Sequence, residues 1–400
     1  MILGINIDEN YACVNVYGNE NVEKIPFAIG KNIANNSWFI GDDAKLENVD
    51  SSDIVIDKLY YLLENDGVAK IGDTDYTAKQ LTNLFINNLM LRYKDVEYVT
   101  IAARSNNIKI LSKLKSALLK VVGDETKIKV TTYSESFVSY IKSKETTYYD
   151  NPIALFNFTE KALTFYELVR FKSDDDIEYW KVNVKEHLFL PLDLLSGDTG
   201  KKVCDNLLND FARECMKEPI YNNIVLAGIG FVHSASYREF MTYVCSVAEV
   251  ETDINFFSKA TAILSNDLLT NNFDENVVLM TDARTTISLK VNVSIDQKET
   301  KLEIIKPGVE WFNIHNYSFD IIVDNEKEIK FEYLMVIEGV IKDFAISFQD
   351  AGDLRIDKSN EFKVSLTFEQ QNILHISITD NGFGEFYEPI YKAITRTVTL

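Results

Sequence analysis

The most informative stretch of the chain reads Met1-Ile-Leu-Gly-Ile-Asn-Ile-Asp-Glu-Asn-Tyr-Ala-Cys-Val-Asn-Val-Tyr17. Two apolar runs, residues 1–7 and 11–17, flank a polar tip at Asp8-Glu9-Asn10. Apolar strand-forming residues on both sides of a short acidic turn are typical of a buried β-hairpin. We therefore expect two paired strands joined by a tip that carries two carboxylates.

A second stretch of the same build reads Ile153-Ala-Leu-Phe-Asn157-Phe-Thr-Glu-Lys-Ala-Leu-Thr-Phe-Tyr-Glu-Leu-Val169. Both hairpins place an asparagine between two hydrophobic residues just before the tip, at Ile5-Asn6-Ile7 and at Phe156-Asn157-Phe158. Both tips also contain a glutamate. Two such hairpins in one chain predict two similar halves that face a shared cleft.

Composition limits the classes of partner. The chain has 400 residues, which allows two or three domains, and its 46% hydrophobic content is enough for large cores. A formal net charge of −20 argues against nucleic acid and anionic membranes, because both require clustered Lys and Arg. We therefore expect a polypeptide or protein partner, with no nucleic acid and no membrane.

Cysteine and histidine usage indicates a reducing compartment and no metal site. The cysteines, Cys13, Cys204, Cys215 and Cys245, lack CxxC spacing and are expected to be free thiols. The four histidines form no metal-ligand motif, and we expect no bound metal. The sequence contains no basic leader and no apolar run of the ~20 residues that a membrane span needs. These features predict a cytoplasmic protein.

The remaining sequence divides into an α/β part and a β part. Residues 54–64, 77–93 and 106–121 have helical periodicity, and apolar runs at 98–102 and 127–132 predict buried strands between helices. From Arg284 the period becomes two, with Phe362, Val364, Leu366 and Phe368 alternating with polar residues. This pattern predicts an antiparallel β-sandwich at the C-terminal end.

Two segments carry a resemblance to a known family. Residues 4–13, G-I-N-I-D-E-N-Y-A-C, resemble the first phosphate loop of the actin-like ATPase superfamily, most closely that of the DnaK-type heat-shock chaperones. Residues 155–164, L-F-N-F-T-E-K-A-L-T, resemble the second phosphate loop. The resemblance implies a ribonuclease-H-like α/β fold with two lobes, of the type that binds ATP in the other members of the superfamily.

Further segments extend this resemblance along the chain. Gly41-Asp-Asp-Ala-Lys45 is similar to the family segment whose lysine reaches the γ-phosphate, and Glu135 falls on a family glutamate. Residues 223–231, with Gly228 and Gly230, look like the segment that contacts adenosine. The large helical insert of the chaperones has no counterpart here, so the peripheral subdomains should be reduced. The C-terminal sandwich resembles the chaperone substrate-binding domain, without a helical lid.

These matches predict a domain organisation for the whole chain. Residues 1–150 form actin-like lobe I and residues 151–274 form lobe II. An interdomain linker covers 275–283, and the β-sandwich covers 284–400.

The resemblance fails at the residues that perform the chemistry. The family's metal-coordinating aspartates fall on Asn6, Asn157 and Thr164. Loop glycines fall on Asp8, Thr159, Glu160 and Lys161. The degenerate nucleotide site comprises the first three with Glu9, Asn10, Gly228 and Gly230. Each contact at ~4 Å between a tip carboxylate and a phosphate would cost on the order of 4 kcal/mol at an effective dielectric near 20. A few such contacts would offset the binding free energy of a micromolar ligand, which is about 8 kcal/mol. We therefore expect a pseudo-ATPase that needs neither ATP nor Mg²⁺ as cofactor.

Three functions remain open on the sequence. The first is a catalytically degenerate, chaperone-like protein, an actin-like scaffold whose sandwich binds a polypeptide or a protein partner. In this interpretation Phe319, Ile321 and Val323 line the peptide groove, on a strand paired with residues 330–336. The alternatives are an active ATPase chaperone with unusual metal ligands, and an actin-like assembly or filament subunit.

Overall fold

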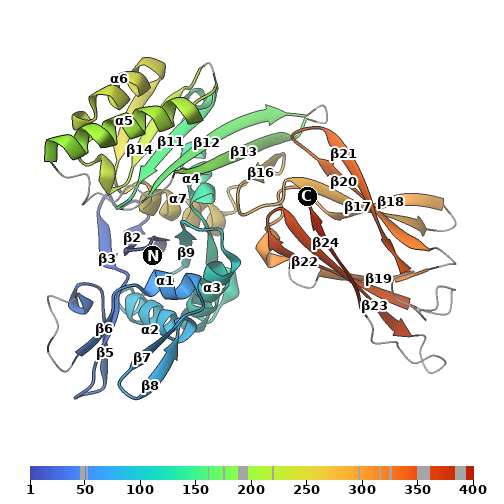
Figure 1. The fold of residues 1–400 in the computed structure, drawn as a ribbon, viewed down its shortest axis with the longest axis horizontal. Coiled ribbons are helices and arrows are strands. Elements are labelled where there is room, and N and C mark those ends of the chain that lie inside the picture. Colours follow the sequence, from blue (N-terminus) through green and yellow to red (C-terminus); the bar gives the residue numbers. More distant parts are fainter. Residues whose placement is uncertain are drawn as a thin grey trace. The chain divides into compact units, whose positions relative to one another are not determined.

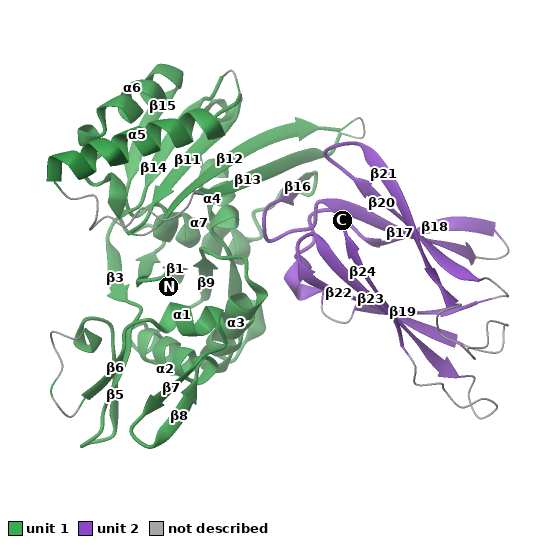
Figure 2. Cartoon of the chain, viewed as in Figure 1, with its two compact units in different colours: residues 1–277 green, residues 278–400 purple. Residues whose placement is uncertain are grey.

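The computed structural model divides the chain into two compact units, Met1–Val277 and Val278–Leu400 (Figure 1; Figure 2). It describes residues 1–45, 50, 53–160, 162–173, 176–187, 197–218, 220–295, 298–314, 317–323, 327–348, 361–382 and 393–400. None of the helices in these ranges is long and apolar enough to cross a membrane.

The first sheet of unit 1 contains the N-terminal hairpin at its centre. Its strand order is β3 (Val22–Pro26), β2 (Tyr11–Val16), β1 (Ile2–Ile7), β9 (Tyr98–Ala103) and β10 (Ile128–Thr132). The first three strands are antiparallel, whereas β9 and β10 run parallel to β1. The predicted hairpin and the two predicted buried strands are confirmed.

The second sheet repeats this arrangement. Within unit 1 its order is β13 (Glu178–His187), β12 (Leu163–Lys172), β11 (Ile153–Phe158), β14 (Asn223–Ala227) and β15 (Glu249–Asp253). Again three antiparallel strands are followed by two parallel ones. Strands and helices alternate along the chain, and the result is an α/β fold whose two sheets share one strand arrangement.

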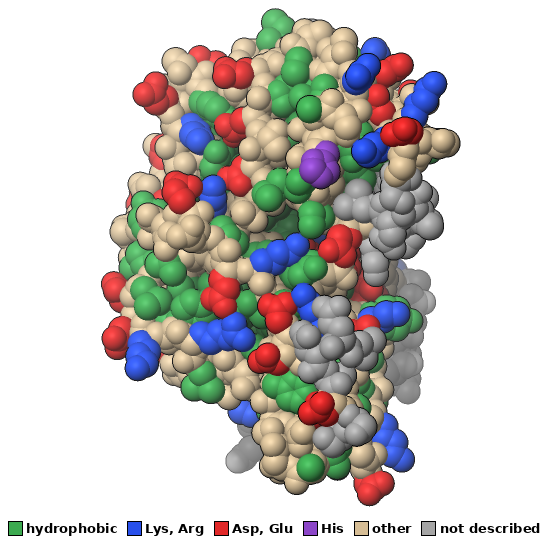
Figure 3. Space-filling model, turned by 90° about the vertical axis from the view of Figure 1, so that its left-hand side faces the viewer, with side chains coloured by type: hydrophobic (Ala, Val, Ile, Leu, Met, Phe, Trp, Pro, Cys, Tyr) green, Lys and Arg blue, Asp and Glu red, His purple; other side chains and the backbone are tan. Residues whose placement is uncertain are grey.

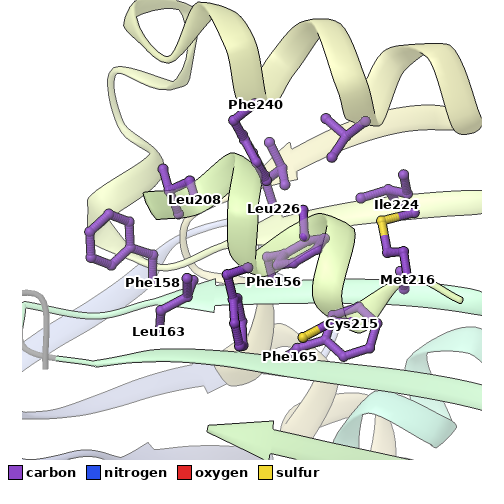
Figure 4. Close-up of a cluster of buried hydrophobic side chains, with 14 of the residues drawn as sticks. Phe156, Phe158, Leu163, Phe165, Leu208, Cys215, Met216, Ile224, Leu226 and Phe240 are labelled. Carbon is purple, nitrogen blue, oxygen red and sulfur yellow. The ribbon is translucent and has the colours of Figure 1, made fainter. Parts of the chain in front are cut away.

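Helices cover the sheets in layers (Figure 1). The helices of unit 1 are α1 (Leu59–Glu64), α2 (Ala78–Met90), α3 (Ile108–Val122), α4 (Tyr133–Lys142), α5 (Gly197–Cys215), α6 (Arg238–Val247) and α7 (Phe256–Thr270). Helices α5 and α6 pack on the second sheet, where Leu208 and Phe240 meet Phe156 and Leu226 (Figure 4). This cluster is rich in aromatic rings, and their burial stabilises the second half.

Helix α7 connects the two halves of unit 1. It lies against β1 so closely that a Cβ atom on Gly4 would stand 2.1 Å from the backbone nitrogen of Ala262. The Ser265 hydroxyl donates to the carbonyl of Leu3 at 2.6 Å. Helix α4 contacts the same helix, with Ser136 Oγ 2.9 Å from Thr261 Oγ1. The shared packing places the two hairpin tips near one another.

The peripheral structure of the first half is small, and one element prediction there is wrong. Strands β4 (Ile29–Asn32), β5 (Ser37–Ile40) and β6 (Asp53–Ile56) form one sheet, and β7 (Val68–Ile71) pairs with β8 (Thr74–Thr77). Residues 54–64 are therefore not one helix. The run Ile54-Val-Ile56 pairs with β4, as β-branched residues favour, and α1 begins only at Leu59.

Unit 2 consists of two antiparallel four-stranded sheets. One has the order β18 (Lys298–Ile305), β17 (Ile287–Ile295), β20 (Glu328–Met335), β21 (Val340–Ser347). The other has the order β19 (Tyr317–Ile322), β22 (Glu361–Gln370), β23 (Ile373–Gly382), β24 (Ile394–Thr399). Phe362, Val364, Leu366 and Phe368 are all buried, which confirms the predicted alternation along this segment. Phe348 packs on Phe362 with ring centroids 5.2 Å apart, as between the layers of a sandwich.

Candidate functional site

Cross-strand rows bring the predicted site residues to equivalent places in the two sheets. In the first sheet Asn6 lies opposite Cys13, which lies opposite Lys24. In the second sheet Asn157 lies opposite Thr164, which lies opposite Glu186. Residues directly opposite one another point to the same face of a sheet. The repeated sequence pattern thus becomes a repeated spatial arrangement.

A cavity of about 160 Å³ lies between the two hairpin tips. Seven of the predicted residues line it: Asn6, Asp8, Asn10, Asn157, Thr159, Glu160 and Gly228. Glu9, Thr164, Gly230, Lys45 and Glu135 are not among its lining residues. Sequence reasoning missed Lys24, Tyr133 and Ile254, which also line this inter-tip cavity.

The first tip is held by its own aspartate. The Asp8 carboxylate accepts hydrogen bonds from the backbone N–H groups of Asn10, at 2.8 Å, and Tyr11, at 2.7 Å. Burial raises the pKa of this carboxyl from 3.8 to about 6, against the lowering effect of the backbone hydrogen bonds. The two backbone N–H groups at this tip are therefore hydrogen-bonded to a carboxylate of the protein itself.

The second tip is closed in a similar way. The backbone N–H of Thr159 donates to the carbonyl of Ala162 at 2.9 Å, and the Ala162 N–H donates to Thr159 Oγ1 at 3.1 Å. Glu160 then joins the two tips, because its carboxylate accepts from the Asn10 side-chain amide at 2.9 Å. The tips are bridged by side chains of the protein itself.

A second bridge connects the halves outside the cavity. Arg104, which follows β9, forms ion pairs with both Glu9 and Glu186. The Arg104 side chain is 15% exposed and that of Glu9 is 22% exposed, so this part of the bridge is poorly hydrated. Glu9 therefore binds an internal arginine. Sequence reasoning missed Arg104, because its contact with Glu186 depends on the strand register that places Glu186 opposite Thr164.

The three residues that the sequence resemblance aligns with aspartates have incomplete hydrogen bonding. Asn6 donates from Nδ2 to the Tyr133 hydroxyl at 2.8 Å, but its Oδ1 has no protein partner. Asn157 Nδ2 and Thr164 Oγ1 also lack a protein partner. The exposed fractions are 7% for Asn6 and 3% for Asn157. Buried polar atoms normally have a hydrogen-bond partner, so three such atoms without a protein partner are unusual in a protein interior.

The two predicted adenosine-segment glycines are explained by packing against β11. A Cβ atom on Gly230 would stand 2.3 Å from the Phe158 ring. One on Gly228, whose φ is +88°, would stand 2.5 Å from the Phe158 carbonyl oxygen. Gly228 lines the inter-tip cavity, whereas Gly230 serves close contact between loop and strand.

The remaining first-half predictions lie outside the cavity. Lys45 ends the short 3₁₀ turn Gly41–Ala44, and its ammonium pairs with Asp42 at 2.6 Å. Glu135 lies in the first turn of α4 and is 2% exposed. Among the described residues, Lys24 is the lysine that lines the cavity, with its ammonium 3.6 Å from the centroid of the Tyr11 ring.

Comparison with known proteins gives a family for most of the chain. The model described as "Family of unknown function (DUF5716) C-terminal" matches residues 10–282, more than half of the sequence. The chain belongs to this family. A second model, "Domain of unknown function (DUF8552)", matches residues 284–400. In this DUF5716 chain the family match begins at Asn10, the last residue of the first tip, and includes the second tip and every residue of the inter-tip cavity except Asn6 and Asp8.

Other comparisons are more distant. No curated protein matches the DUF5716 chain. One matching solved structure is described as "Crystal structure of apo psk41 parM protein". It is 12% identical, with 68% of this chain and 98% of that chain covered, and the TM-score is 0.41.

The predicted peptide groove in the DUF8552 region needs correction. Strand β19 pairs with β22, whereas β20 pairs with β17 and β21, so residues 318–323 and 330–336 belong to different sheets. Phe319 and Ile321 lie opposite Val364 and Phe362, which are fully buried, so both face the core. Val323 is buried as well. The apolar residues that were predicted to line a groove, Phe319, Ile321 and Val323, therefore contribute to the core of the β-unit.

The residues of the inter-tip cavity do not fit a magnesium nucleotide. Phosphate loops need free backbone N–H groups and glycines, and here Asp8 and Thr159 accept N–H bonds within the two tips. No cluster of three or more His, Cys, Asp or Glu suited to a metal occurs in the described ranges. The volume is also below the ~300–1,000 Å³ of typical ligand pockets.

Proposed function

We propose that the chain is a nucleotide-independent, actin-like scaffold protein whose C-terminal β-unit engages a protein partner. Residues 1–150 and 151–274 act as two lobes, and 275–283 join them to the β-unit. The protein is a pseudo-ATPase that works in the cytoplasm without nucleic acid or membrane. Its four free cysteines and its net charge of −20 support this environment and these exclusions.

One observation carries the proposal, namely that the protein's own side chains bridge the cleft. Asp8 takes the N–H groups of the first tip, and the Asn10–Glu160 hydrogen bond joins the two tips. A nucleotide would have to displace these bonds and approach two carboxylates. Its binding energy would therefore be spent on breaking internal contacts and on repulsion between like charges.

Calorimetric titration with Mg·ATP tests the nucleotide part. We expect no heat of binding in the micromolar range and no phosphate release above a heat-inactivated control. The double variant Asn6→Asp/Asn157→Asp restores the carboxylates that the family uses for metal, and we expect no binding by it either. Micromolar affinity in the unmodified protein would refute the proposal.

The β-unit offers a strand edge to a polypeptide. Strand β19 has one described neighbour, β22, so the backbone groups of its other edge are not paired within the described sheet. Tyr317 is 47% exposed and Ile322 is 62% exposed on this strand. An extended peptide can add to such an edge, and its alternate side chains then decide specificity. We expect a labelled Leu-rich heptapeptide to bind with Kd on the order of 10 μM or weaker in fluorescence anisotropy.

A second candidate function is that of an assembly subunit. Val340 and Ile341 on the edge strand β21 are 44% and 59% exposed, and Ile322 on β19 adds another exposed apolar side chain. Edge strands with exposed apolar residues can join copies of one chain. Sedimentation over a concentration series distinguishes the two functions, because a scaffold stays at constant mass and an assembly subunit grows with concentration.

A further inference from the structure

Two groups of contacts join the halves of unit 1, and they differ in kind. The first group, which we call the packed contact, lies where α7 meets β1 and α4. Tyr133 on α4 stacks on Phe257 on α7 with ring centroids 4.0 Å apart, and both rings are buried. A Cβ atom on Gly4 of β1 would stand 2.1 Å from the backbone of α7. Contacts of this kind depend on close packing and owe little to charge.

The second group lies at the hairpin tips and consists of polar contacts. The side-chain amide of Asn10 on the first tip donates to Glu160 on the second tip at 2.9 Å. Arg104 forms ion pairs with Glu9 on the first tip and with Glu186 on β13. We call these contacts the tip latch. The Glu186 side chain is 54% exposed, so this ion pair is open to solvent and to salt.

The inter-tip cavity lies between these two groups of contacts. Its lining includes Asn10 and Glu160, which belong to the tip latch, and Tyr133 and Phe257, which belong to the packed contact. The halves are therefore separated by an open volume of about 160 Å³ between the latch and the packed contact. Loss of the tip latch would leave the packed contact intact, and the tips could then move apart about it.

We propose that the tip latch is a salt-sensitive switch that holds the cleft of unit 1 closed, and that its release lets the tips separate about the packed contact. This inference rests on the proposed nucleotide-independent function, because contacts within the protein bridge the cleft. Ionic strength is the effector. At 1 M salt the screening length falls to about 3 Å, which weakens partly exposed ion pairs much more than buried packing. The open state exposes the lining of the inter-tip cavity to solvent.

The chain contains a probe of the open state. Cys13 lines the inter-tip cavity and is half-buried. Burial raises the pKa of its thiol from 9.0 to about 12, so it should react slowly with maleimides while the cleft is closed. Cys245 is exposed and reports the intrinsic rate of the reagent. Cys204 and Cys215 are buried in the core of the second half, so they report global unfolding.

Alkylation by N-ethylmaleimide, an uncharged reagent, tests the proposal on the full chain. Mass spectrometry gives the rate at each cysteine relative to that at Cys245. In Arg104→Gln the relative rate at Cys13 should rise about tenfold at low salt, because both ion pairs of the latch are lost. In the unmodified protein it should rise by about threefold or more between about 0.05 and 1 M NaCl. Glu186→Gln removes one ion pair and should give an intermediate rate.

A matched variant controls for general effects of charge and salt. Acidic and basic side chains are interspersed over one face of the molecule, so salt screens many surface pairs at once (Figure 3). Arg92→Gln removes an arginine whose ion-pair partner, Glu23, belongs to the same half of unit 1. It should leave the relative rate at Cys13 unchanged.

Three results would overturn the inference. They are an unchanged Cys13 rate in Arg104→Gln, an unchanged Cys13 rate at high salt in the unmodified protein, and a parallel rise at Cys204, which would indicate global unfolding. The second needs no variant to fold. Addition of Mg·ATP separates this inference from the proposed function. Slower alkylation of Cys13 with Mg·ATP would contradict the nucleotide exclusion, whereas loss of the salt dependence would contradict the latch alone.

Discussion

Single residues at the two hairpin tips determine what this fold can bind. Asp8 and Thr159 stand where the resemblance places loop glycines, and each accepts backbone N–H bonds of its own tip. Their side chains therefore act as internal substitutes for a bound anion. Asn6 and Asn157, which the resemblance aligns with aspartates, also line the cavity, so neutral amides stand at both positions.

The buried carboxyl of Asp8 should make stability depend on pH. Burial raises its pKa from the ordinary value of 3.8 to about 6 in the folded protein, so the folded state binds the proton more tightly. The free energy of unfolding should therefore fall as pH rises from about 4 to 6, by at most about 3 kcal/mol. Asp8→Asn keeps one acceptor oxygen for the two amides and removes the charge. We expect it to be more stable than the unmodified protein at pH 7.

Urea unfolding of both proteins across this pH range measures the effect. The two curves should converge below pH 4, where Asp8 is protonated in both states. Parallel curves at all pH values would show that Asp8 does not titrate in this window.

At the scale of elements, the contact between β1 and α7 holds the two halves together. Gly4→Ala would bring a Cβ atom to 2.1 Å from the backbone of α7, where no side chain can move aside. We expect a loss of at least about 3 kcal/mol in the free energy of unfolding. Gly123→Ala is the control, since Gly123 has φ +76° and nothing within 4 Å of the added atom. It should cost about 1–2 kcal/mol from backbone strain alone.

Chemical denaturation of the two glycine variants distinguishes them. If Gly4→Ala cost no more than Gly123→Ala, α7 would be free to move away from β1, and the close packing would not be required.

The start of α6 depends on a side chain from α5. Asp205 accepts the backbone N–H groups of Glu239, at 3.0 Å, and Phe240, at 2.9 Å, and it is 7% exposed. Asp205→Ala leaves these donors without a partner, and we expect a loss of about 1–2 kcal/mol. Asp210→Ala, at an exposed position on the same helix, should stay within about 0.5 kcal/mol of the unmodified protein. Equal thermal unfolding midpoints for the two variants would contradict the capping role.

Across unit 1 as a whole, Arg104 connects one residue from each half. Its partners are Glu9 on the first tip and Glu186 on the second sheet. Arg104→Gln leaves two carboxylates without their cation, and we expect a loss of about 2 kcal/mol together with faster amide exchange at Asn10 and Tyr11. Arg92→Gln breaks a more exposed ion pair, with Glu23, and should cost less than about 1 kcal/mol.

Hydrogen exchange of both arginine variants provides the measurement. Unchanged exchange at the first tip in Arg104→Gln would show that the bridge does not keep the halves together. The Arg92→Gln protein controls for general loss of positive charge.

The sequence by itself determined the strands that are buried on both faces or alternate cleanly. The Asn6 and Asn157 hairpins and the Phe362–Phe368 alternation belong here, because their hydrophobic period is local and the turns between them are short. The prediction of one helix over residues 54–64 is wrong. The continuous apolar run Ile54-Val-Ile56 fits helical and strand periodicity equally, and only its pairing with β4 makes it a strand. The strand pair expected around Phe319 failed for a related reason, because periodicity does not say which strand lies beside which.

Only the tertiary structure decided how the cavity is built. Lys24 lines it and Glu186 reaches Arg104 through cross-strand register, which no local pattern contains. The sequence match places Lys45 at the nucleotide site, but its ammonium pairs with Asp42, three residues earlier, and Lys45 does not line the cavity. The sequence alone indicated which residue types stand at the tips, since that needs no knowledge of the fold. The Asp8 clamp, the Asn10–Glu160 bond and the unpaired amides depend on distances between segments up to 150 residues apart, and folding alone sets those distances.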